Sequence, residues 1–198
     1  MAVRRNRRVR ADTLPKVGGA MVGIATAPIS AKGAVLLVGV VERGGMVEGV
    51  LTTRVLRDGT DSTAKIAHMI SRSRFSTQVK FVALDGISVA GLNVVEIRTL
   101  EKRLGVSCIS ITKRKPHRQL MKNAIRLYGE RKGIDVSNRL DLLDATLDKP
   151  IPVSGMILLT EVQGPRRREI LVRRAAEAVR LAHLIASGVS RKESKGRI

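Results

Sequence analysis

Three strand-like segments follow one another near the N-terminus, and the chain between the first two is too short for a helix. The segments are Ala20–Ala25, Ala34–Val41 and Val47–Leu56, and the second is apolar on both faces, as a central strand is. Parallel neighbours need a crossover of about a dozen or more residues, whereas only residues 26–33 separate the first two segments. The sequence therefore predicts an antiparallel meander and excludes a doubly wound parallel sheet.

Helical and strand patterns alternate through the rest of the chain. In order, they predict helix Ser62–Arg74, strand Lys80–Leu84, helix Val94–Leu104 ending at Gly105, strand Ser107–Thr112, a helix from Pro116 to about Tyr128, helix Ser137–Leu147, strand Met156–Val162 and helix Arg167–Ala186 ending at Gly188. A meander followed by helix-linked strands is the order of the ribonuclease-H-like α/β fold, a mixed sheet of five strands with helices on both faces. We expect one such domain at residues 17–188, between a basic arm at 1–16 and a basic tail at 189–198. Its sheet should bury Ile24, Val38, Val40, Val82, Leu84, Ile109 and Ile111.

The charge of the chain favours a polyanionic partner. Lysine and arginine number 37 against 17 aspartates and glutamates, a formal net charge of +20. Arginine supplies 25 of the 37 positive charges, and its guanidinium binds phosphate bidentately, so we expect nucleic acid. The candidate nucleic-acid-binding residues form four clusters: Arg4, Arg5, Arg7, Arg8 and Arg10; Lys113, Arg114, Lys115 and Arg118; Arg166, Arg167, Arg168, Arg173 and Arg174; and Arg191, Lys192, Lys195 and Arg197.

The scarcity of aromatic residues limits how nucleic acid can be recognised. Phe75, Phe81 and Tyr128 are the only aromatic side chains, too few for a platform that stacks splayed bases. Phosphate contacts and shape are therefore the expected basis of binding, and they serve RNA and DNA alike. Basic termini, a small core and abundant arginine are typical of ribosomal proteins, which favours structural RNA such as ribosomal RNA. A DNA-coating chromatin protein is an alternative.

Several classes of protein are excluded by what the sequence lacks. No apolar stretch reaches the roughly 18 residues of a membrane span, and Gly18, Gly19, Gly23 and Pro28 interrupt any signal-peptide helix. We therefore expect a cytoplasmic protein with no membrane partner. Cys108 is the only cysteine, so a disulfide framework and a cysteine-based zinc site are excluded. Scarce asparagine and glutamine favour a thermophilic source.

Two carboxylates and a histidine occupy positions at which a nuclease of this fold carries its chemistry. Asp85 directly follows the strand Lys80–Leu84, Asp61 precedes a predicted helix, and His183 lies late in the last helix. Ribonuclease-H-like nucleases gather carboxylates at one sheet edge to bind Mg²⁺, which orients the attacking water. Each residue also has a structural interpretation: Asp85 as a turn residue before Gly86, Asp61 as a helix N-cap, and His183 as a packed helix residue.

Several sequence blocks resemble those of the endonuclease dU family, the archaeal relatives of endonuclease V. They are, in the family order, GVVERG at 39–44, DGTDST at 58–63, LDGISVAGLNVVE at 84–96, TKRKP at 112–116, RLAHLIASG at 180–188 and ESKGR at 193–197. The resemblance runs from about Met21 to the C-terminus. It implies a ribonuclease-H-like, Mg²⁺-dependent endonuclease acting on DNA with a deaminated base. It matches Asp61, Asp85 and His183 to family catalytic residues, with the two aspartates as metal ligands.

The chain departs from the family pattern at the catalytic end. The family's first strand ends in Gly-Ile-Asp-Asp, whereas this chain has Gly-Ile-Ala-Thr at residues 23–26, so the central metal ligand is replaced by Ala25. An alanine methyl cannot coordinate Mg²⁺. Glu96 stands where the family usually has Asp, Leu92 replaces a Phe, and residues 176–178 read Ala-Glu-Ala where Pro-Glu-Pro is common.

These departures favour a binding protein on an endonuclease-V-like scaffold that has lost metal-dependent cleavage. Binding of this kind needs no cofactor. The alternative is an active endonuclease that requires Mg²⁺ and recruits other ligands, for example Asp58 or Glu96. Either hypothesis places Ala25 and Asp85 on adjacent strands, near His183.

Overall fold

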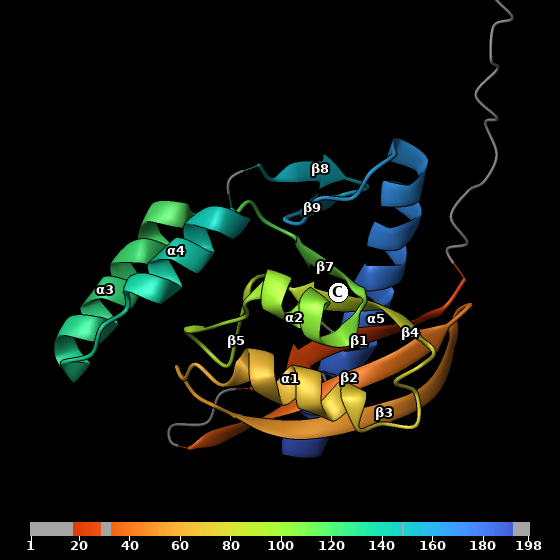
Figure 1. Cartoon of the computed structure of the whole chain (residues 1–198), viewed down its shortest axis with the longest axis horizontal. Coiled ribbons are helices and arrows are strands. Elements are labelled where there is room, and N and C mark those ends of the chain that lie inside the picture. Colours follow the sequence, from red (N-terminus) through yellow and green to blue (C-terminus); the bar gives the residue numbers. More distant parts are fainter. Residues whose placement is uncertain (1–17, 29–32, 148, 192–198) are drawn as a thin grey trace, which may run out of the picture.

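The computed structural model describes residues 18–28, 33–147 and 149–191. A seven-stranded mixed sheet in the order β3-β2-β1-β4-β7-β9-β8 forms its centre (Figure 1). The predicted meander is confirmed: β1 (Ala20–Thr26), β2 (Ala34–Arg43) and β3 (Met46–Leu56) are antiparallel neighbours. Next come β4 (Val79–Asp85), parallel to β1, and β7 (Ser107–Thr112), parallel to β4. The seven residues predicted to lie buried in the sheet are each 0 or 1% exposed.

The sheet has two more strands than the expected five. The predicted strand Met156–Val162 is shorter, β9 (Met156–Leu158), and pairs antiparallel with β7. Its other partner is β8 (Ile151–Val153), the edge strand that the sequence did not indicate. Three residues that include Pro152 give almost no alternating pattern, and proline is tolerated at a sheet edge because a backbone donor is not required there.

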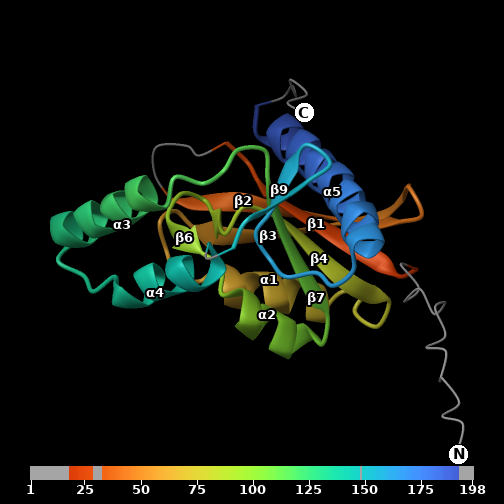
Figure 2. The ribbon, with the colours of Figure 1, turned by 90° about the horizontal axis from the view of Figure 1, so that it is seen from above.

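Two helical layers cover opposite faces of the sheet. Figure 2 shows α1 (Ser62–Ser71) and α2 (Ile97–Leu104) together on one face and α5 (Pro165–Arg191) on the other. The helical hairpin of α3 (Arg118–Lys132) and α4 (Ser137–Thr146) projects to one side. No helix among the described residues is long and apolar enough to cross a membrane.

Several predicted helix boundaries were wrong: α1 ends at Ser71 and not at Arg74, and α3 spans Arg118–Lys132 and not Pro116 to about Tyr128. Two further differences have a clear local cause. Residues Asn93 and Val94 form β6 (Asn93–Val94), which pairs with β5 (Ser88–Val89), so the helix predicted from Val94 begins at Ile97. Gly188 does not end α5, which continues to Arg191. A glycine inside a helix costs only about 1 kcal/mol, and the buried apolar face of α5 offsets this cost. Gly105 does end α2, with the left-handed φ of 65° expected of a C-cap.

Small residues let α5 pack closely on β1. Ala175, Ala178, Ala182 and Ala186 are fully buried along one side of the helix. A Cβ on Gly23 would lie 2.2 Å from the carbonyl carbon of Ala178, so helix and strand backbones nearly touch at this glycine. Cys108, on β7, packs as a core residue. Its burial raises the pKa of its thiol well above the usual value.

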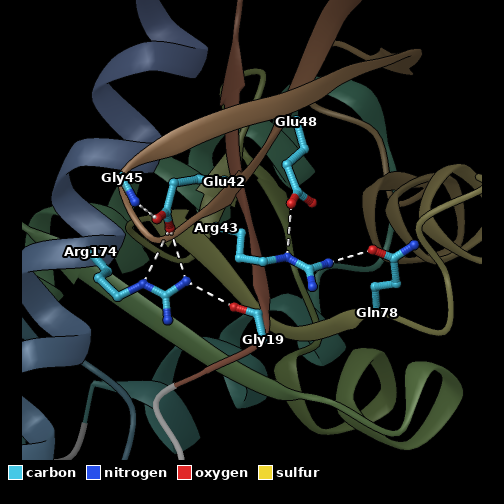
Figure 3. A network of polar contacts seen from close by, with 7 residues as sticks. All are labelled: Gly19, Glu42, Arg43, Gly45, Glu48, Gln78 and Arg174. Carbon is cyan, nitrogen blue, oxygen red and sulfur yellow. Dashed lines mark hydrogen bonds and ion pairs between the residues drawn. The ribbon is translucent and has the colours of Figure 1, made fainter.

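A largely buried ion pair joins α5 to Glu42 at the end of β2, and the same arginine contacts the residue before β1 (Figure 3). Arg174 donates from Nε and Nη2 to Glu42 Oε2, at 3.2 and 3.0 Å, and from Nη2 to the carbonyl oxygen of Gly19 at 3.0 Å. Gly45 N donates to Glu42 Oε1 at 2.7 Å. Since Arg174 contacts Gly19 and Ala178 lies over Gly23, α5 runs in the same direction as β1.

Candidate nucleic-acid interface at the carboxyl edge of the sheet

Four strands end at the same edge of the sheet. Because β2 is antiparallel to both β1 and β3, the latter two run the same way, and β4 and β7 are parallel to β1. Their last residues are Thr26, Leu56, Asp85 and Thr112. This carboxyl edge therefore collects the loops that follow all four strands, as is usual for functional sites of sheets with parallel strands.

Asp85 and His183 meet at this edge. Asp85 Oδ2 and His183 Nε2 are 3.0 Å apart, and the two side chains are 48% and 39% exposed. The turn after Asp85 is held by Gly86, with a φ of 74°, whose N–H donates to the carbonyl oxygen of Ile111 at 2.7 Å. Because both side chains are open to solvent, their contact adds little to stability. The structure thus brings together two of the three residues matched to family catalytic positions.

Ala25 lies beside Asp85, as expected. The last registered pair of β1 and β4 is Ile24 with Leu84, which places the following residues, Ala25 and Asp85, next to one another. Ala25 is 3% exposed and offers only a methyl group. The position of the family's central carboxylate is therefore filled by an apolar side chain that contacts the core.

Asp61 has its carboxylate engaged elsewhere. Its Oδ1 accepts hydrogen bonds from Leu56 N at 3.1 Å and from Asn93 Nδ2 at 2.8 Å. It also occupies the N-cap position of α1 without making a side-chain cap hydrogen bond, so its interpretation as a cap was wrong. Instead, Asn93 Oδ1 accepts a hydrogen bond from the backbone N of Ser62, the first residue of α1, at 3.2 Å. The buried Asn93, which the sequence did not single out, thus joins β6 to the loop before α1.

Of the two alternative metal ligands, Asp58 has structural partners for its carboxylate. Asp58 has the positive φ of a turn residue, 53°, and its Oδ1 accepts a hydrogen bond from Leu92 N at 2.8 Å. Glu96 precedes α2, and its backbone N donates to Thr63 Oγ1 at 2.9 Å. Asp58 is therefore used to join the loop after β3 to the β5–β6 hairpin.

These donors do not fit the Mg²⁺ that the family resemblance implies. Magnesium needs several oxygen ligands in near-octahedral geometry. Asp85 is a single carboxylate whose Oδ2 contacts an imidazole, Ala25 has no donor atom, and Asp61 is tied to Leu56 and Asn93. Within the described ranges, no group of three or more His, Cys, Asp or Glu residues is arranged to hold a metal ion.

Comparison with known families identifies the scaffold. The family model of endonuclease dU matches residues 18–190. The chain belongs to the endonuclease dU family. It is 35% identical over 167 residues to a UPF0215 protein of Methanopyrus kandleri, covering 80% of this chain and 84% of that protein. A UPF0215 protein of Methanothermobacter thermautotrophicus is 33% identical over 186 residues, covering 89% and 90%.

Solved structures confirm the fold of this endonuclease dU family member. The crystal structure of a protein of unknown function from Archaeoglobus fulgidus matches with a TM-score of 0.75 and 27% identity, covering 86% of this chain and 98% of that one. Human endonuclease V matches with a TM-score of 0.53 and 12% identity, covering 91% and 88%. The predicted ribonuclease-H-like class is therefore confirmed, with the β8–β9 hairpin as an extension of the sheet.

One predicted basic cluster of this family member lies at the carboxyl edge. Lys113, Arg114 and Lys115 directly follow β7 and are all exposed. None of the three has an ion-pair partner in the part of the chain that the structure describes. These cations follow a strand that ends at the same sheet edge as Asp85, and they are free to bind an anion.

Other predicted binding residues have partners within the protein. Arg174 is held by Glu42, and Arg168 donates to the carbonyl oxygen of Val162 at 3.2 and 3.0 Å. Arg173 pairs with Glu169 at 2.9 Å. Arg118 pairs with Asp144 at 2.7 Å, and Lys122 and Arg118 together lower the pKa of Asp144. We therefore omit these four arginines from the proposed interface.

The remaining predicted cations have varied placement. Arg166 is exposed and Arg167 half-buried at the start of α5, and Arg191 is the last residue of α5. Arg4, Arg5, Arg7, Arg8, Arg10, Lys192, Lys195 and Arg197 lie outside the described residues.

Proposed function

We propose that this protein binds nucleic acid through phosphate contacts at the carboxyl edge of the sheet and does not cleave it. The observation that supports this most is the exposed, unpaired segment Lys113–Lys115 beside an edge at which Ala25 replaces a carboxylate. The net charge of +20 supports a polyanionic partner. Membership of the endonuclease dU family supports nucleic acid as that partner.

Structural RNA, such as ribosomal RNA, is the favoured partner. The low aromatic content leaves phosphate and shape as the features that can be recognised, and a folded RNA presents both. This part of the proposal rests on analogy with ribosomal proteins. Purification at low salt tests it, because we expect ribosomal RNA to accompany the protein; genomic DNA instead would favour a chromatin protein.

A Mg²⁺-dependent endonuclease is the second candidate, favoured by the 3.0 Å contact of Asp85 with His183 at a solvent-open edge. We expect no cleavage of uracil- or inosine-containing DNA with Mg²⁺ or Mn²⁺ above the level of an Asp85→Asn control, because too few carboxylates face one point to hold the ion. Binding of the same DNA should survive in the variant. Robust Mg²⁺-dependent nicking that Asp85→Asn abolishes would establish the endonuclease instead.

An Ala25→Asp variant tests the same question from the opposite direction, because it adds the carboxylate that the parent lacks at this position. The new carboxylate would lie beside Asp85 at a position that is 3% exposed, so the variant should be less stable without metal, since a buried unpaired carboxylate is costly. Addition of Mn²⁺ should then raise its Tm while leaving the Tm of the parent unchanged. An equal response of both proteins to Mn²⁺ would show that the parent already holds a metal site.

The salt dependence of affinity should identify the edge cluster as part of the interface. In a Lys113→Gln/Lys115→Gln variant, the slope of log K against log salt should become shallower by about 0.7 to 0.9 for each phosphate that the protein no longer binds. The matched control is Arg173→Gln/Arg180→Gln, which removes two cations already paired with Glu169 and Glu177. Equal slopes in the two variants would mean that total charge, and not the edge, determines binding.

A further inference from the structure

Residues of α1 and α2 line a groove. These two helices cover the face of the sheet opposite α5 (Figures 1 and 2). The volume of the groove is about 550 Å³, and it is lined by Ala64, Lys65, Ala67, His68, Ser71 and Arg103. The residues on α1 are three or four positions apart, so they share one side of the helix. Ala64 and Ala67 are small, which leaves the space between the helices open.

The groove is cationic and has no acidic lining residue. Lys65, His68 and Arg103 are all exposed, and none has an ion-pair partner among residues 18–28, 33–147 and 149–191. The nearby carboxylate of Glu101 is directed to β7, where it accepts a hydrogen bond from Cys108 N at 2.9 Å. Asp61, before α1, is tied to Leu56. None of these described carboxylates therefore pairs with Lys65 or Arg103.

We propose that the α1–α2 groove binds a phosphate group between Lys65 and Arg103. The guanidinium fork can donate two parallel hydrogen bonds to phosphate oxygens, and the ammonium adds a compact point charge. His68 supplies a further ring N–H donor. The lining has no aromatic side chain to stack a base, so the groove takes the phosphate and not the nucleobase.

The favoured source of this phosphate is a nucleic-acid backbone, and that choice rests on the proposed function. A strand held here would contact the face of the molecule that carries α1 and α2, in addition to the carboxyl edge. Free phosphate is the other source of the same chemistry. The two cations are 38 positions apart in the sequence, which is why no cluster in the sequence indicated the groove.

The NMR signals of the three histidine imidazoles test the proposal, because each reports on a different part of the molecule. His68 lies in the groove, His183 at the carboxyl edge and His117 at the start of α3. At fixed pH and ionic strength, inorganic phosphate replacing chloride should shift the His68 signal of the parent. The shift should disappear in Lys65→Gln/Arg103→Gln and persist in Arg131→Gln/Lys132→Gln, a control with the same charge change on the projecting hairpin.

A single-stranded oligonucleotide distinguishes the two sources. If the backbone is bound, the oligonucleotide should shift the His68 signal, and Lys65→Gln/Arg103→Gln should raise Kd roughly threefold to tenfold and reduce the salt slope by about one. A His68 shift with inorganic phosphate alone would assign the groove to free phosphate. A His68 signal that neither probe moves would overturn the proposal, while oligonucleotide binding seen at His183 would leave the proposed function intact. Failure of the oligonucleotide to bind anywhere would refute the proposed function alone.

Discussion

An Arg174→Met variant should lose about 3 to 5 kcal/mol of unfolding free energy, the usual cost of breaking a buried ion pair. The side chain of Glu42 is 4% exposed and Arg174 is its ion-pair partner, so the substitution leaves a buried carboxylate uncompensated. The carbonyl oxygen of Gly19 loses a donor as well. Urea denaturation followed by circular dichroism gives the free energy of unfolding.

Two further variants show whether the loss comes from the unpaired carboxylate. Glu42→Met/Arg174→Met should recover most of the stability, because well-packed apolar side chains can replace a buried pair at little cost. Arg173→Met, next in the chain, removes an arginine that is 70% exposed and paired with Glu169, so it should change stability little. If Arg174→Met is no worse than Arg173→Met, the network in Figure 3 does not anchor α5.

A Gly23→Ala variant should be destabilised by about 1 to 3 kcal/mol or more, the cost of overpacking a core. The added Cβ would lie 2.2 Å from the carbonyl carbon of Ala178 and 2.6 Å from Val179 N, which are backbone atoms of α5. The helix must move away from β1 for the methyl group to fit. Because His183 is on the same helix, its contact with Asp85 should loosen, and the imidazole signal of His183 should change.

Gly39→Ala on β2 is the matched control. Its Cβ would meet the Met69 methyl carbon at 3.0 Å and a Val22 methyl carbon at 3.1 Å. The methionine side chain is flexible and can turn aside, so the loss of stability should be smaller and the His183 signal should stay in place. Equal losses in the two variants would show that the β1–α5 approach tolerates a side chain.

The central strands could be predicted because their burial leaves a strong pattern. Residues 34–41 are almost continuously apolar, and β2 is buried on both faces. The short chain before this segment then determines that β1 and β2 are antiparallel. The strands that were missed, β5, β6 and β8, have two or three residues each, too few to show any period. The sequence misplaces the end of α5 because Gly188 is typical of a helix stop, although packing decides where a helix of this kind ends.

The candidate site could be predicted only where strand direction determines position. Asp85 is the last residue of β4, so its place at the carboxyl edge follows from the topology, and the family resemblance added His183. The role of Asn93 was missed because a buried amide that joins two loops has no local sequence signature. Arg174 lies in a basic run yet is internal, since its partner Glu42 is 132 positions away.

At the carboxyl edge, the positions matched to metal ligands and the exposed cations belong to different strands. Two residues that the family resemblance matches to metal-ligand positions, Ala25 and Asp85, lie at the ends of β1 and β4, whereas the exposed cations follow β7. A substitution at Ala25 therefore leaves the Lys113–Lys115 segment and its backbone unchanged. Under the function proposed above, changes at the end of one strand alter the capacity of this edge to bind metal without removing the cations that would contact a nucleic acid.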